Sequence, residues 1–138
     1  MPARDSVDDA VRHALIKEGW TITNDPFHLR YAEDDLFVDL AAERFLAAEK
    51  GSHKIAVEIK TFGGLSQMNE LHQAVGQFIV YRDVLERLEP DRDLFLAVPE
   101  VIRQTVFAEG VGALVLRREI RRLFSVDVKS EEIVSWMT

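Results

Sequence analysis

A glutamate and a lysine, Glu58 and Lys60, stand two residues apart in the otherwise largely apolar segment 55–61. The alternation of side chains predicts a β-strand, in which successive residues point to opposite faces. One face is then formed by Ile55, Val57 and Ile59, and the other by Ala56, Glu58 and Lys60. Because charged groups inside a sheet are costly unless they are paired or bind a metal, Glu58 and Lys60 are candidate site residues.

The preceding predicted strand, residues 36–41, offers a second carboxylate. Its alternation places Leu36, Val38 and Leu40 on one face and Asp35, Phe37, Asp39 and Ala41 on the other. Asp39 faces Glu58 across a hairpin if the register of the two strands brings them level. Two adjacent carboxylates repel each other unless a cation lies between them, and such oxygen ligands suit Mg²⁺ or Mn²⁺. The expected metal ligands are therefore Asp39 and Glu58.

Lys60 has two chemical roles open to it beside such a metal. A lysine next to a cation can position or deprotonate an attacking water, or stabilise charge on a phosphate. The alternative is that Glu58 and Lys60 form a structural ion pair on an exposed sheet face.

A polar stripe is expected on the helix that follows. Gln73, Gln77 and Tyr81 recur every four residues and therefore share one face. Amide and phenol groups beside a carboxylate–lysine strand can orient a water or touch a nucleic-acid backbone. A solvated helix surface is the alternative interpretation.

The elements that hold these residues follow from hydrophobic spacing and capping signals. Ser6 is the expected N-cap of the first helix, with Asp9 in the capping position, and Ser66 that of the long helix. Predicted helices span 6–18, 66–88, 99–108 and, ambiguously, 111–122. Predicted strands span 20–23, 36–41, 53–62, 93–98, 123–128 and 133–136, with turns at 24–26 and near 49–52. This order predicts an α/β (α+β) fold with a mixed central sheet flanked by helices and a C-terminal β-hairpin.

Composition restricts the classes of function. The chain has 138 residues, 47% hydrophobic, with no cysteine and no apolar run long enough to cross a bilayer, so a cytoplasmic protein without membrane association is expected. The net charge of −7 argues against strong unaided binding to DNA, since phosphate contacts dominate such affinity. Four arginines, Arg117, Arg118, Arg121 and Arg122, form the one dense basic cluster; contact with phosphate or an acidic partner is as well supported as a solvated face.

A resemblance to the D…(D/E)xK signature of the restriction-endonuclease-like, or PD-(D/E)xK, superfamily is carried by Asp39, Glu58, Ile59 and Lys60. Gln77 to Tyr81 is similar to the QxxxY motif of RecB-like members, and the element order matches the αβββαβ core of that fold. The resemblance implies one restriction-endonuclease-like domain over residues 1–138, with Asp39, Glu58, Lys60, Gln77 and Tyr81 as catalytic residues. Asp9 resembles an acidic residue that some members place on the first helix. The gap between Asp39 and Glu58 exceeds that of the tightest nuclease hairpins, which leaves Asp35 as an alternative ligand.

A closer resemblance, to the XisH family of fdxN element excision controlling factors known from cyanobacteria, covers nearly the whole chain. It is carried by the segments 14–23, 35–43, 54–60, 76–82 and 96–99. It implies control of the site-specific excision of a DNA element, together with an XisI-type partner protein. An active Mg²⁺-dependent DNA endonuclease and a non-catalytic, protein-binding regulatory subunit are the alternatives, and homo-oligomer formation is left open.

Overall fold

The structure, a computed structural model, describes residues 4–47 and 51–138. Within these ranges the elements follow one another as α1 (Arg4–Lys17), β1 (Thr21–Asn24), β2 (Phe27–Tyr31), β3 (Asp34–Val38), β4 (Leu40–Leu46), β5 (Gly51–Ile59), α2 (Gln67–Leu88), β6 (Arg92–Pro99), α3 (Glu100–Thr105), α4 (Gly110–Val115), the π-helix η2 (Leu116–Ile120), β7 (Leu123–Asp127) and β8 (Glu132–Met137).

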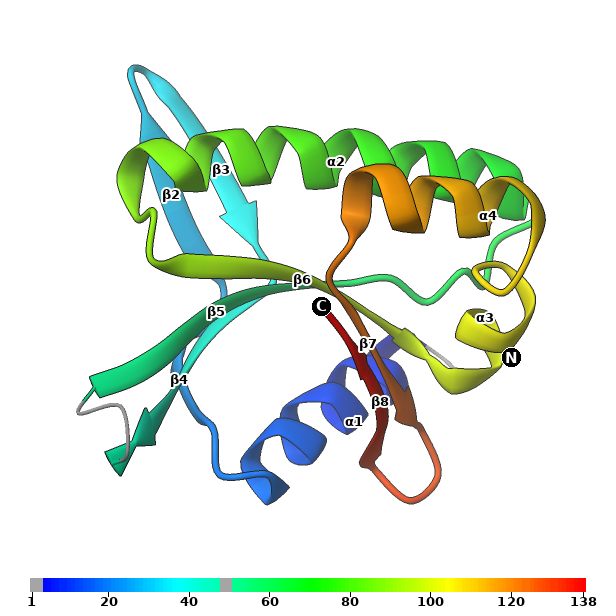
Figure 1. The fold of residues 1–138 in the computed structure, drawn as a ribbon, viewed down its shortest axis with the longest axis horizontal. Helices are drawn as coiled ribbons and strands as arrows, with labels where there is room; N and C mark the ends of the chain where they lie inside the picture. Colours follow the sequence, from blue (N-terminus) through cyan, green and yellow to red (C-terminus); the bar gives the residue numbers. More distant parts are fainter. Residues whose placement is uncertain (1–3, 48–50) are drawn as a thin grey trace.

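A mixed sheet forms the centre of the molecule. In the described part of the chain its six strands lie in the order β1-β4-β5-β6-β7-β8, and β5, β6 and β7 run parallel to one another while the remaining pairs are antiparallel. Figure 1 shows α2 and the α4–η2 segment on one face of the sheet and α1 on the other. The expected mixed sheet flanked by helices is thus confirmed, as is the C-terminal hairpin of β7 and β8.

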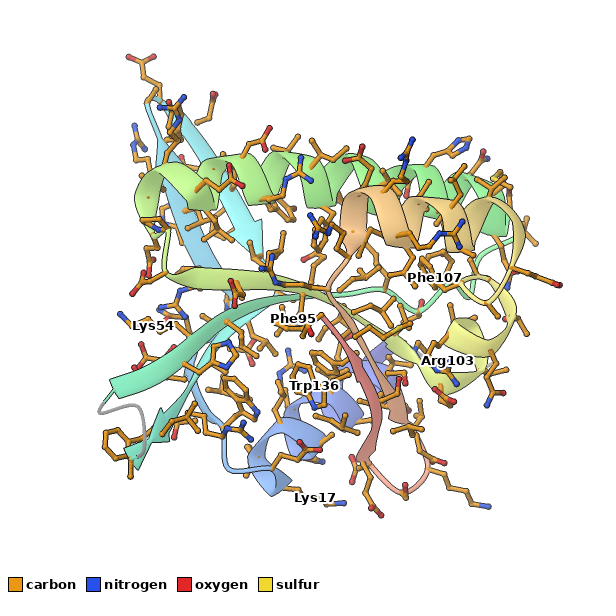
Figure 2. All side chains as sticks on the ribbon, in the orientation of Figure 1. Lys17, Lys54, Phe95, Arg103, Phe107 and Trp136 are labelled. Atoms are coloured by element: carbon orange, nitrogen blue, oxygen red, sulfur yellow. The ribbon has the colours of Figure 1, made fainter. Side chains whose placement is uncertain are left out.

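Two hydrophobic clusters fill the space on the two faces of the sheet. The cluster beneath α1 includes Val57, Phe95 and Phe124, and Trp136 packs against it; Figure 2 shows Phe95 and Trp136 on this side of the sheet, where their rings meet edge to face at 5.0 Å. The cluster beneath α2 includes Ala56, Phe78 and Leu96 among its buried members. Alternate residues of the central strands therefore serve opposite layers, as the period of a strand requires.

The long helix α2 begins as its sequence indicates. Ser66 has an extended backbone, and its hydroxyl accepts a hydrogen bond from the Asn69 backbone N–H at 3.2 Å. This bond satisfies one of the free N–H groups at the start of the helix. The apolar face of α2 buries Leu71, Ala74, Phe78 and Leu85 against the sheet.

The structure differs from the prediction in three places. Helix α1 already includes Arg4, so Ser6 and Asp9 lie inside the helix and do not cap it. The strand expected over 36–41 is two strands divided at Asp39, and β3 pairs with the unpredicted β2 in a separate two-stranded sheet. The predicted helix over 111–122 is α4 continued by a π-helix. The turn expected near 49–52 falls partly on residues outside the described ranges.

No helix in the described part of the chain is long and apolar enough to span a membrane.

Close packing of α4 depends on Gly112. A Cβ atom at this position would lie 1.7 Å from the Val106 carbonyl oxygen, a backbone atom that cannot move aside cheaply. We expect Gly112→Ala to destabilise the fold by about 2–4 kcal/mol through overpacking, measured by urea unfolding.

Gly76, in α2, is the matched control for this substitution. A Cβ there would meet no atom within 4 Å, so Gly76→Ala is expected to stabilise the protein by about 1 kcal/mol through the higher helix propensity of alanine. Equal effects of the two substitutions would refute the packing role of Gly112.

Candidate functional site

Glu58 lies near the carboxyl end of the central strand β5, with its side chain on the α2 face of the sheet. It is 6% exposed, although it carries an ionisable group. Its neighbours Val57 and Ile59 belong to the cluster on the opposite face, and Ala56 to the cluster beneath α2. The predicted division of faces in this segment is therefore confirmed, and Glu58 and Lys60 share a face.

Asp39 occupies the break between β3 and β4, at the level of Glu58. In the β4–β5 ladder Leu40 pairs with Val57, so the next step along both strands brings Asp39 beside Glu58. The Asp39 backbone N–H donates to Glu58 Oε1 at 3.2 Å, and the Ile59 backbone N–H donates to Asp39 Oδ2 at 2.7 Å. Each carboxylate thus accepts a hydrogen bond from the strand that carries the other, which fixes the pair in place.

The predicted alternation around Asp39 is wrong in one respect. Val38 belongs to the cluster beneath α2 and Leu40 to the cluster beneath α1, so the two do not share a face. The reason is the change of sheet: the chain leaves the β2–β3 ladder after Val38 and enters the β4–β5 ladder at Leu40. Asp39 therefore sits at a bend, where its backbone N–H is free to bond Glu58.

Lys60 follows directly after β5. Its Nζ lies 3.7 Å from Glu58 Oε2, and its backbone N–H donates to the Ala97 carbonyl at 3.0 Å, which extends the pairing with β6. The side chain of Lys60 is 24% exposed, whereas that of Glu58 is largely buried. The ammonium group can therefore reach both the buried carboxylate and a ligand from solvent.

The electrostatics of Glu58 reflect its burial. Desolvation, and then the negative charge of Asp39, raise the pKa of Glu58 to about 8, and the positive charge of Lys60 opposes this shift. Burial and the charges of Glu58 and Asp39 also raise the pKa of Tyr81, whose ring packs against the cluster beneath α2. Without a further cation, Glu58 therefore keeps its proton at neutral pH.

The polar stripe of α2 lies over these residues. Gln73 lines a small pocket together with Lys60 and Glu70, and the charges of Glu58 and Asp39 act on Tyr81; Gln77 lies between Gln73 and Tyr81 on the same stripe. Gln77 Oε1 is buried and has no hydrogen-bond partner in the structure. A buried acceptor of this kind calls for a donor such as a bound water.

Two sequence candidates lie away from this site. Asp35 is on the exposed β2–β3 hairpin, where its carboxylate contacts His28 Nε2 at 2.7 Å and Arg30 Nη1 at 3.3 Å. Asp9 is exposed on α1, on the opposite face of the sheet, with Arg12 as an ion-pair partner at 3.8 Å. The geometry therefore brings Asp39, and neither Asp35 nor Asp9, to Glu58.

Sequence reasoning missed one buried charge, Arg92, at the start of β6. Its guanidinium donates to the Ile55 carbonyl and to Glu89 Oε1, both at 3.1 Å, and lies 5.0 Å from the centre of the Phe27 ring. These contacts tie β5, β6 and the β2–β3 hairpin together at the start of β6, four residues before Leu96, which pairs with Glu58. No spacing signal marks this role, because these three partners come from three separate segments.

A second missed feature is the backbone of Phe62, two residues after Lys60. Its φ of 56° is in the left-handed region, although the residue is not glycine. The ring is 1% exposed and meets Phe107 edge to face at 5.5 Å; Figure 2 shows Phe107 beside α3. Burial of this ring holds the turn that leads from the E-x-K segment to α2.

The donor set suits a hard divalent cation. Among the described residues no three His, Asp or Glu side chains gather as a metal-binding group, so Asp39 and Glu58 would act as a pair. Mg²⁺ is commonly bound through one or two carboxylates while water and substrate oxygens fill its other positions. Together, fold and site define a mixed α+β protein with a carboxylate pair, of which Glu58 is buried and Asp39 half-buried, and a lysine at the carboxyl end of a central strand.

Comparisons with known proteins place this class of protein in a family. The family model described as XisH protein matches residues 1–134. The chain therefore belongs to the XisH family. No curated protein matches it.

Two crystal structures are similar over nearly the whole chain. One is an XisH family protein from Nostoc punctiforme PCC 73102, 38% identical, with a TM-score of 0.87 over 97% of this chain and 100% of that one. The other is an fdxN element excision controlling factor protein from Anabaena variabilis, also 38% identical with a TM-score of 0.87, over 98% of this chain and 100% of that one.

Proposed function

We propose that this protein is a controlling factor for the site-specific excision of a DNA element of the fdxN type, built on a restriction-endonuclease-like fold with a Mg²⁺- or Mn²⁺-binding PD-(D/E)xK site. The observation that carries the site is the reciprocal hydrogen bonding of Asp39 and Glu58, with the Lys60 ammonium beside them. The role in excision rests on family membership and on the similarity to the fdxN element excision controlling factor protein from Anabaena variabilis.

The order of elements supports this fold. If the β2–β3 excursion is set aside, the sheet and its helices follow as α1, β1, β4, β5, α2 and β6. This is one helix, three strands, a helix and a strand, the αβββαβ order of the restriction-endonuclease-like core. The whole chain from 1 to 138 then forms one domain of this type.

Each residue has a role that follows from its position. Asp39 and Glu58 would hold the cation; when bound, it would polarise a phosphate and lower the pKa of a water. Lys60 reaches the solvent side of the pair, where its ammonium can orient that water or neutralise charge on a phosphate oxygen. Gln77, with its unpaired buried oxygen, and Tyr81 would orient a water from the helix side.

The test of the metal site is calorimetry with Mn²⁺ on the full chain and two aspartate variants. Asp39→Asn keeps the shape of the side chain and an acceptor for the Ile59 N–H but removes a ligand charge, and we expect it to weaken Mn²⁺ binding by 10-fold or more, on the order of 1.4 kcal/mol. Asp35→Asn is the matched control, because Asp35 is an exposed carboxylate of the adjoining hairpin, and its affinity should be unchanged. Equal binding by all three proteins would disprove the site.

Catalysis is tested separately from metal binding. If the protein is an endonuclease, cleavage of DNA in Mn²⁺ should be lost in Lys60→Ala, whose carboxylates remain in place. Cleavage that survives this substitution would come from a contaminant. If DNA stays intact in all conditions although the metal still binds, the chain would control excision without cutting DNA itself.

A second candidate function, a non-catalytic regulatory subunit, is favoured by the net charge of −7. An acidic protein gains less from phosphate contacts and can act through another protein, here an XisI-type partner. Co-purification of the two proteins, with DNA affinity only in the complex, would support it. Failure of the two to associate at micromolar concentrations would count decisively against it.

A further inference from the structure

A cluster of arginines lies on η2 and on the two residues that connect η2 to β7, away from the carboxylate pair. The π-helix η2 buries Leu116 and Ile120, which leaves Arg117 and Arg118 exposed on its outer side. Arg121 ends the π-helix with a φ of 62°, in the left-handed region, and Arg122 follows it. In Figure 1 this segment, coloured orange beyond the label α4, lies beside α2.

A polar groove of about 400 Å³ separates η2 from the second half of α2. Its lining carries four arginines, Arg82, Arg92, Arg121 and Arg122, and four acids, Asp83, Glu86, Asp93 and Glu119. Arg82 follows Tyr81 on the helix and is turned about 100° from it, so the groove, which Arg82 lines and Tyr81 does not, lies along a different side of α2 from the carboxylate pair. The groove is therefore a separate surface from the proposed metal site.

Most of the acids in the groove are already neutralised. Arg82 lies within 3.5 Å of both Asp83 and Glu119, and Arg122 lies 3.6 Å from Asp93. Arg92 is likewise paired, with Glu89 and Glu43. These pairs fix the paired arginines but add little net charge to the surface.

The remaining arginines have no such partners. Across the described ranges no ion pair or side-chain hydrogen bond involves Arg117, Arg118 or Arg121, whereas most other cations of the chain have a carboxylate or carbonyl partner. These three exposed guanidinium groups give the η2 segment a local excess of positive charge on a protein whose net charge is −7, whereas the groove beside it balances four arginines with four acids. Such a local excess attracts an anionic partner even where the whole molecule does not.

Guanidinium groups favour one class of anion. Their planar fork donates two parallel hydrogen bonds to a phosphate, and several forks along one edge match the repeating charge of a phosphodiester chain. We propose that Arg117, Arg118 and Arg121 form a binding surface for the sugar-phosphate backbone of DNA along η2. The proposal rests on the proposed role in DNA excision for its choice of nucleic acid over an acidic protein.

The test measures affinity for a duplex DNA of random sequence as a function of salt, with EDTA present so that the metal site plays no part. Each phosphate contact contributes a slope of about 0.9 in log affinity against log salt concentration. The triple variant Arg117→Gln, Arg118→Gln, Arg121→Gly should therefore lower the slope by about 2.7 and weaken binding roughly tenfold or more at low salt. Glycine at position 121 retains the left-handed backbone.

Matched controls separate this surface from a general effect of charge. Lys129 is an exposed cation on the turn between β7 and β8, where neighbouring residues contact α1 on the opposite side of the sheet, and Lys129→Gln should leave the slope unchanged. If Arg117→Lys and Arg118→Lys replace the two glutamine substitutions of the triple variant, most of the lost slope should return, because lysine retains the charge. Circular dichroism melting identifies a variant that has merely lost its fold.

The proposal would be overturned by the absence of measurable DNA binding by the unaltered chain at low salt, by an equal loss in Lys129→Gln, or by an unchanged slope in the triple variant. Loss of binding to poly-glutamate, with DNA binding retained, would instead identify the surface as a docking site for an acidic protein and would also overturn it. Failure of Mn²⁺ to bind would refute the metal site while leaving this EDTA-based result intact.

Discussion

Replacement of Glu58 by glutamine is expected to stabilise the protein at pH 9 and to abolish its binding of Mn²⁺. Glu58 is buried beside Asp39, and its pKa is raised to about 8. A carboxyl group whose folded pKa exceeds its unfolded value stabilises the fold fully below about pH 4.5, and this contribution is lost as the pH rises to about 8. Above that pH the folded protein carries the full cost of a buried charge, which glutamine does not have.

The expected gain for Glu58→Gln is on the order of 4 kcal/mol at pH 9 and close to zero at pH 4.5. It is measured by urea unfolding in EDTA at several pH values. Glu132→Gln, which changes an exposed glutamate of β8, provides the control and should show the same pH profile as the unaltered protein. A Glu58→Gln profile that still falls between pH 5 and pH 8 would show that another group causes the loss of stability.

Binding of Mn²⁺ should tighten by roughly tenfold per pH unit between pH 6 and pH 8 and become constant above pH 8. The reason is that a metal ligand must be deprotonated, and Glu58 holds its proton up to about pH 8. Calorimetry in two buffers of different ionisation enthalpy should detect the release of about one proton per ion bound.

Tyr81→Phe is the control for this pH dependence. It retains both carboxylates and removes only a phenol whose own pKa is raised further above the tested range. Its slope should match that of the unaltered protein. An affinity that does not depend on pH would mean that the metal binds elsewhere or that Glu58 is already ionised.

The candidate site was predictable where one local rule decides the outcome. A period of two residues places Glu58 and Lys60 on one face of β5, and the structure agrees because β5 is a regular central strand with neighbours on both sides. Ser66 was predictable as an N-cap for a similar reason, since the cap and its bond to Asn69 lie within four residues.

The β2–β3 hairpin was not predictable from turn chemistry. Its turn carries Ala32 with a φ of 54°, where glycine, asparagine or aspartate is the usual signal. The hairpin is stabilised instead by tertiary packing, since Phe27, Leu29 and Val38 are buried in the cluster beneath α2. A strained backbone conformation that is stabilised by distant contacts gives no signal in the neighbouring sequence.

The bend at Asp39 escaped prediction because the apolar pattern continues across it. Leu36, Val38 and Leu40 alternate with more polar residues as one strand would, yet Val38 and Leu40 serve different layers of the core. Only the pairing partners, β2 on one side and β5 on the other, reveal the change of sheet. The π-helix η2 likewise depends on packing against α2.

The ladder between β4 and β5 accounts for the long sequence gap between Asp39 and Glu58. The paired residues begin with Leu40 and Val57, at the end of the hairpin next to the carboxylates. They continue to Leu46 and Gly51 at the other end. Residues added or removed in equal number on the two strands at that far end would leave Asp39 level with Glu58. Homologues can therefore differ in the length of this hairpin while keeping the same pair of carboxylates, so a fixed spacing between the two acidic residues is a poor criterion for finding the site in related chains.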